Sequence, residues 1–312
     1  MRRRSAFTMI ELVMVIVVFG IVASIGAEII ASLYNNYLRT RSINRLQSQT
    51  ELTLEQIAKR LQYRIKDSVR ASANNGTTWL PLPSAINTPG NVYNTIEWIG
   101  ISNESFLGEW DAASAAVVPG WSGLIDMESN TTRLGTRTLE TPGSRLDIAE
   151  NIIFALTNGD INMSNEGGQL PALIFKGAKP LYNVNNYYTE GGNTYTTHVS
   201  RSTNTTFHIP LDDNLTDGNL FEQYYLAHTA YALVPVGGVN DFNLTLRYNY
   251  QPWEGEKFDD AAVIAAAQVL AENVSTFRIR QEGDVVRIKL CIHDNNQSGD
   301  FDFSACKEKV IY

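Results

Sequence analysis

The first hydrophobic pattern in the chain is continuous. From Phe7 to about Ile30 nearly every side chain is apolar. A helix of that length, rising about 1.5 Å per residue, crosses a hydrocarbon layer of about 30 Å. No second run of this length follows. The pattern predicts one membrane-spanning helix, which we place at residues 7–33.

The pattern then becomes periodic, with no sign that the helix ends. No proline occurs before Pro81, and good helix formers dominate residues 32–71. Apolar side chains recur there at steps of three and four residues, which places them in one stripe along the helix, opposite a basic face. We expect the helix to continue in amphipathic form over residues 34–72 and to pack this stripe on a sheet. The stripe consists of Leu54, Ile57, Ala58, Leu61, Ile65 and Val69.

Residues 73–312 change to short apolar or alternating runs between turn residues, a pattern typical of strands. The predicted fold class is α+β, a long N-terminal helix packed on an antiparallel β-sheet head. One later helix is predicted at residues 261–272 from its helical period. The predicted strands are residues 96–101, 146–156, 172–176, 224–236, 242–250, 277–281, 285–293 and 310–312.

A polar segment at residues 183–219 interrupts the head pattern. It is dense in Asn, Thr, Tyr, Gly and Ser and lacks the aliphatic runs that a core needs. This composition indicates a large surface insertion. Tyrosines among small polar residues suit recognition, and a passive loop explains the composition equally well.

Charge and chemistry exclude two classes of function. The chain has 33 acidic and 25 basic residues, a net charge of −8, so it repels phosphate backbones and we expect no nucleic acid partner. The four histidines show no metal-binding or catalytic spacing, and no nucleophile elbow or phosphate-binding loop occurs. We therefore expect no enzyme activity.

The two cysteines, Cys291 and Cys306, lie close together near the C-terminus. In an oxidising compartment they can close one small loop; two free buried thiols are the alternative. Between them, oxygen-bearing side chains alternate as in the first half of an EF-type calcium loop, but Ala305 stands where that loop needs a bidentate glutamate. Calcium and a plain polar turn both stay open. The candidate ligands are Asp294, Asn296, Ser298, Asp300 and Asp302.

One charged residue interrupts the apolar run. Glu11 lies five residues into the predicted span, where an ionised carboxylate is costly and marks a functional site by default. The basic leader Met1-Arg2-Arg3-Arg4-Ser5-Ala6, followed by Phe7-Thr8-Met9-Ile10-Glu11, resembles the N-terminus of type IV prepilins and type II secretion pseudopilins. The likeness is good over about the first 70 residues. Residues 269–279, which lead into a hairpin, are similar to J-type pseudopilins and W-type minor pilins.

This resemblance implies how the chain is processed and used. A prepilin peptidase would cut the leader, residues 1–6, between Ala6 and Phe7 and methylate the new amino group; Ala6 stands where family members usually have glycine. The resemblance also implies a pilin-like fold, an inner-membrane location with a cytoplasmic N-terminus, and assembly through Glu11. The implied partners are other pilin or pseudopilin subunits and an inner-membrane assembly platform.

The size of the head, residues 73–312, favours a minor subunit that primes or caps a filament over a densely repeated major one. A membrane-tethered adhesin or substrate-binding module that never polymerises is the alternative. Such a tether has no use for Glu11, so this residue discriminates between the two hypotheses.

Overall fold

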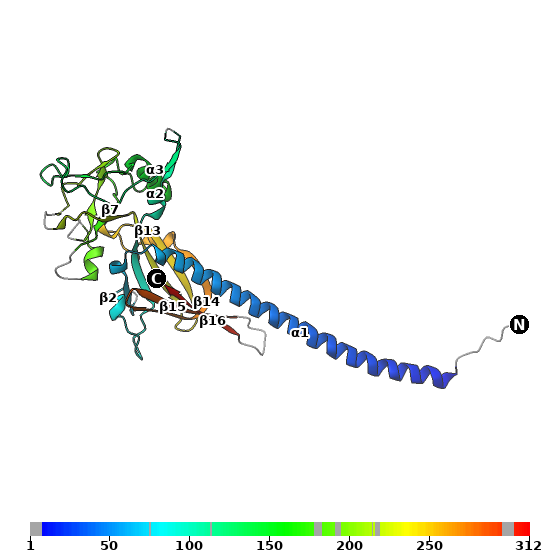
Figure 1. The fold of residues 1–312 in the computed structure, drawn as a ribbon. Coiled ribbons are helices and arrows are strands. Elements are labelled where there is room, and N and C mark those ends of the chain that lie inside the picture. Colours follow the sequence, from blue (N-terminus) through cyan, green and yellow to red (C-terminus); the bar gives the residue numbers. More distant parts are fainter. Residues whose placement is uncertain are drawn as a thin grey trace.

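The computed structural model describes residues 8–312, except residues 75, 113, 178–182, 191–194, 214, 216–218 and 295–302. A long helix, α1 (Met9–Gln62), projects from a head built around one large antiparallel sheet (Figure 1). The fold is therefore α+β and pilin-like, as the sequence predicts.

Helix α1 has an exposed half and a packed half. Nearly every described side chain from Met9 to Arg41 is exposed. From Leu46 onward, one stripe of the helix is buried against the head, including Leu54, Ile57 and Leu61. The amphipathic stripe thus packs as its period predicts.

The helix ends at Gln62, ten residues before the predicted end at residue 72. The buried Arg64 follows the last turn and donates from Nη1 to the carbonyl of Leu61 at 2.7 Å. The Ile65 N–H then donates to the carbonyl of Ile99 at 2.9 Å, so the chain already runs along the sheet. Ile65 and Val69 are buried as predicted, but outside the helix.

The main sheet has eight strands in the order β16-β15-β14-β13-β12-β3-β1-β2, and its pairings are antiparallel. Helix α1 packs across one face, chiefly over β16 and β15. The core between them contains Ile57, Leu61, Trp98 and Phe277. The strands are β1 (Arg70–Ser72), β2 (Leu80–Pro81), β3 (Thr95–Gly100), β12 (Thr229–Gly237), β13 (Phe242–Tyr250), β14 (Gln268–Glu282), β15 (Val285–His293) and β16 (Ser304–Ile311).

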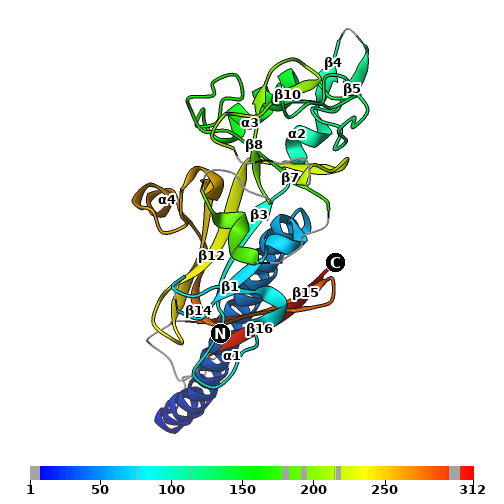
Figure 2. The same ribbon diagram turned by 90° about the vertical axis from the view of Figure 1, so that its left-hand side faces the viewer.

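Residues 101–228 form a second unit, which we call the insertion lobe. Gly100 and Thr229 lie opposite each other in β3 and β12, so the chain leaves and rejoins the sheet at one point. Figure 2 shows the lobe beyond the C-terminal end of α1. Its elements are α2 (Asn103–Leu107), β4 (Glu109–Asp111), β5 (Ala116–Val118), β6 (Thr138–Glu140), α3 (Leu146–Leu156), β7 (Ala172–Phe175), η3 (Val184–Tyr188), β8 (Thr197–His198), β9 (Ser200–Arg201), β10 (Thr206–His208) and β11 (Tyr224–Ala227).

The insertion lobe has its own core and a seam with the sheet. Trp121, Leu139 and Ile153 lie in the lobe core. Ala172, Ile174 and Tyr187 pack instead with Tyr250 and Trp253 of the main unit. The lobe is therefore fixed to the face of the sheet opposite α1. Short 3-10 helices η1 (Lys66–Ser68), η2 (Leu82–Ser84) and η5 (Pro252–Glu254) and helix α4 (Ala261–Ala265) complete the described elements.

The insertion is larger than predicted. The segment at residues 183–219 is only part of it, and that segment is not a passive surface loop. Tyr187, Val199 and Phe207 are fully buried, because the segment supplies strands to both three-stranded sheets of the lobe. Aromatic and β-branched side chains scattered among polar neighbours were sufficient to build this core.

Three element predictions were wrong. Residues 146–156 form helix α3, because Leu146, Ala149 and Ile153 bury one helical face. The predicted helix at residues 261–272 stops at Ala265, and the chain then enters β14, whose first residues pair with β13 and so override helix propensity. The predicted strand at 224–236 is two strands in different sheets, β11 and β12, which meet at His228.

Candidate assembly interface along the N-terminal helix

The exposed half of α1 presents apolar side chains around its whole circumference. Met9 is 88% exposed, Phe19 72% and Ile30 68%. Within the described part of the chain, α1 is the one helix that is long and apolar enough to cross a membrane. A surface this apolar needs a cover other than water.

Glu11 lies in the first turn of this exposed segment. Its Oε2 atom accepts hydrogen bonds from the backbone N–H of Thr8 at 2.9 Å and from the Thr8 hydroxyl at 3.0 Å. A carboxylate at this position satisfies a donor that the start of a helix leaves free. Ala6 and Phe7 lie outside the described residues, so pairing between Glu11 and the amino group of Phe7 stays a prediction.

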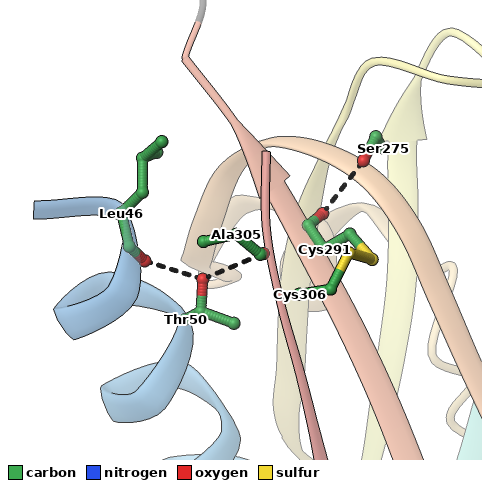
Figure 3. The surroundings of a disulfide bond; sticks show 6 residues. All are labelled: Leu46, Thr50, Ser275, Cys291, Ala305 and Cys306. Carbon is green, nitrogen blue, oxygen red and sulfur yellow. Dashed lines mark hydrogen bonds between the residues drawn. A yellow bond between two sulfur atoms is a disulfide. The ribbon is translucent and has the colours of Figure 1, made fainter. Parts of the chain in front are cut away.

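Polar contacts from the packed half of α1 fix the helix to the C-terminal strand. Lys307 pairs with Glu51 at 2.6 Å, and Lys309 pairs with Glu55 one turn further on. Figure 3 shows Thr50, whose hydroxyl donates to the carbonyl of Leu46 at 2.7 Å and lies 3.5 Å from that of Ala305. Exposed ion pairs such as these contribute little to stability. They set the register of the helix on the strand, and the buried stripe provides the stability.

The predicted disulfide between Cys291 and Cys306 is present (Figure 3). The two residues lie directly opposite each other in β15 and β16, with Cα atoms 4.1 Å apart. A bridge across a sequence separation of 15 is worth about 3 kcal/mol in the chain-entropy model. Strand β16 is an edge strand of the sheet, and α1 packs on it. The disulfide therefore links the strand that contacts the helix to its neighbour β15.

Of the candidate calcium ligands, Asp294 lies within the described residues. Asp294 donates its backbone N–H to the carbonyl of Phe303 at 2.9 Å, and its carboxylate accepts a hydrogen bond from Ser42 of α1. Asn296, Ser298, Asp300 and Asp302 lie outside the described residues. Over the residues that are described, no three His, Cys, Asp or Glu side chains are close enough to hold a metal. Calcium in this loop stays a prediction.

A buried polar cluster lies where the insertion lobe joins the main sheet. His228 Nδ1 lies 2.9 Å from the hydroxyl of Ser102, which lies 2.6 Å from that of Ser105. Ser102 and Ser105 are fully buried, and burial lowers the pKa of His228 to about 4. Burial thus keeps the imidazole neutral at pH 7 and encloses both serine hydroxyls, although a Ser–His pair resembles a nucleophile and its base.

Sequence reasoning missed two groups of buried charge. In the first, Arg70 pairs with Glu97. The second lies between the insertion lobe and η5, where His198 and Glu254 approach to 3.8 Å beside Asp213. No spacing rule connects residues so far apart in the sequence; the pairing of β1 with β3 and the return of the insertion bring them together.

Comparison with known proteins gives one match. Residues 1–27 match the family model of the prokaryotic N-terminal methylation motif. Neither the curated proteins nor the solved structures provide a match. The motif covers the leader, Glu11 and most of the exposed apolar segment. Together with the long apolar helix that begins inside it, the motif marks the N-terminus of the chain as that of the type IV pilin and pseudopilin family.

Proposed function

We propose that the chain is a minor pilin or pseudopilin subunit of a type IV pilus or a type II secretion pseudopilus. Prepilin peptidase removes the leader between Ala6 and Phe7, and the mature subunit enters the filament through α1. One observation carries the proposal. The first half of α1 is apolar and exposed on every side, while its second half is rigidly attached to the head.

A membrane and a filament core each supply the cover that this segment needs. Before assembly, lipid surrounds it; afterwards, the helices of neighbouring subunits do. Arg2, Arg3 and Arg4 favour a cytoplasmic N-terminus by the positive-inside rule, which puts the head across the inner membrane. The assembly platform in that membrane and other subunits are then the partners, and the work of the chain is mechanical and not enzymatic.

The insertion lobe supports a place at the end of the filament. It lies beyond the C-terminal end of α1, along the direction in which the stem points (Figures 1 and 2). A further subunit stacked in that direction would meet the lobe. At the tip no such subunit follows, so a subunit that primes or caps the filament can carry the lobe without a clash.

Immunogold labelling tests this position. A peptide tag inserted at Gly135, an exposed lobe residue with open space around it, should place gold at one end of isolated filaments. An untagged strain is the control. Gold along the shaft would contradict the priming or capping role, and gold confined to membranes would favour a tethered module that does not polymerise.

A further inference from the structure

Three arginines follow the exposed apolar segment of α1 directly. Between Glu28 and Glu51 the only charged residues are Arg39, Arg41 and Arg45. Tyr34 and Tyr37, each 60% exposed, precede them. Tyrosines at the end of a membrane span lie at the level of the lipid headgroups. Arg41 is one turn, about 6 Å, beyond Tyr37.

Two of these arginines have no partner in the described part of the chain. Arg39 stacks over the ring of Phe303 at 4.9 Å. Arg41 and Arg45 are exposed and make no hydrogen bond, ion pair or ring contact with any described residue. They are four residues apart and therefore share one face of α1.

Arg41 and Arg45 line a groove of about 510 Å³ between α1 and the sheet. Leu38 and Leu46 lie on the same wall, and Glu272 and Asp294 lie on the other. Asp294 already accepts a hydrogen bond from Ser42. In a helix each Cα–Cβ bond tilts toward the N-terminus, which for α1 is the direction of the membrane. The side chains of Arg41 and Arg45 therefore leave the helix toward the headgroups, and their long stems allow the guanidinium groups to reach further.

Acidic and basic residues are unevenly distributed over the chain, with an acidic excess in the insertion lobe. The insertion lobe contains 15 of the 33 acidic residues and six of the 25 basic ones. It lies at the end of the molecule away from the exposed stem (Figure 1). Negative charge is thus concentrated far from the membrane, and unpaired positive charge lies beside it.

We propose that Arg41 and Arg45 bind the phosphate of an anionic phospholipid headgroup on the head side of the membrane. The inference rests on the membrane span proposed above. Guanidinium groups pair well with phosphate oxygens, and the open groove gives a headgroup access from the stem side. Such a contact holds the subunit upright in the bilayer and must break when the subunit is lifted into a filament.

Lipid retention by the full-length chain tests the proposal. The chain is placed in nanodiscs of equal phosphatidylglycerol and phosphatidylcholine, released into mild detergent, and its bound lipids are counted by native mass spectrometry. We expect phosphatidylglycerol to be enriched, by on the order of fivefold for each arginine near the surface. The variant Arg41→Gln/Arg45→Gln should lose the enrichment, and Arg41→Lys/Arg45→Lys should keep most of it.

Two controls separate this site from general charge. Lys59→Gln removes an exposed cation from the same helix further from the membrane and should leave the enrichment unchanged. Glu272→Gln removes a negative charge from the facing wall of the groove and should leave the enrichment unchanged or raise it. Equal retention of both lipids by the wild type, or unchanged enrichment in the double Gln variant, overturns the inference. A chain that fails to enter nanodiscs overturns the membrane span as well.

Discussion

Arg70 of β1 and Glu97 of β3 lie opposite each other in the sheet, and two nitrogens of Arg70 converge on one carboxylate oxygen of Glu97. Nε donates to Oε2 of Glu97 at 2.7 Å, and Nη2 lies 2.6 Å from the same atom. The Tyr250 hydroxyl donates to Oε1 at 2.8 Å. The carboxylate is 1% exposed, and burial raises its pKa against the opposing effect of Arg70.

Removing the cation from this pair should lower the free energy of unfolding. Arg70→Met leaves a buried carboxylate without its partner, which costs about 3–5 kcal/mol. The double variant Arg70→Met/Glu97→Gln removes both charges and should recover most of the loss. Urea unfolding of the full chain in detergent measures both. A double variant as unstable as the single one would show that packing by Arg70, stacked at 3.6 Å on Tyr188, matters more than charge.

Glu254 should make the stability of the head depend on pH. Burial and the nearby carboxylates of Asp212, Glu256 and Glu190 raise its pKa to about 7, against the hydrogen bond from the Leu170 N–H. The folded state therefore binds a proton more tightly than the unfolded state, whose value is 4.5. This contribution to stability is complete below pH 4.5 and is lost as the pH rises through 7.

The variant Glu254→Gln removes that titration and keeps an acceptor for Leu170. We expect it to be more stable than the wild type at pH 8, by on the order of 2 kcal/mol, and similar at pH 5. Thermal melts of both proteins across this range give the difference directly. A difference that does not vary with pH would contradict the assignment to Glu254.

The sequence predicted the stem better than the head. Continuous apolar character and a three-to-four period are local signals, so the span, the stripe from Leu54 to Leu61 and the strands near β13 and β15 could be predicted. The end of α1 could not, because Ile65 and Val69 keep the period although the Ile65 N–H donates to Ile99 of β3 and the Val69 carbonyl accepts from Leu82. The insertion lobe was underestimated for the same reason: its boundaries are defined by the contact of Gly100 with Thr229.

Substitutions at Asp294 and Ser42 can distinguish calcium binding from the hydrogen bond that joins these two residues. Without calcium, Asp294→Ala and Ser42→Ala should destabilise the full chain by a similar amount, about 1–2 kcal/mol, because each breaks the same hydrogen bond. With millimolar calcium the wild type and Ser42→Ala should melt higher, and Asp294→Ala should gain less. Differential scanning calorimetry with the disulfide intact measures this. Equal melting temperatures with calcium and chelator would leave the loop as a polar turn.

Glu11 should be needed for assembly and not for membrane insertion. Glu11→Leu removes a charge from an apolar segment, so insertion should be unchanged, while recovery in sheared filaments should fall at least tenfold if the carboxylate sets register with the Phe7 amino group. Glu28→Gln, a second acidic residue on the exposed stem, is the matched control and should assemble normally. Wild-type recovery of Glu11→Leu would leave this residue with its capping role alone.

The central claim is that the chain is a processed pilin-type subunit, and the N-terminus of the mature protein tests it most directly. Mass spectrometry of the protein purified from its native membrane should find a chain that begins at Phe7 with one methyl group on its amino nitrogen. An intact Met1, or a cut beyond the apolar segment such as one after Ala31, would contradict the account.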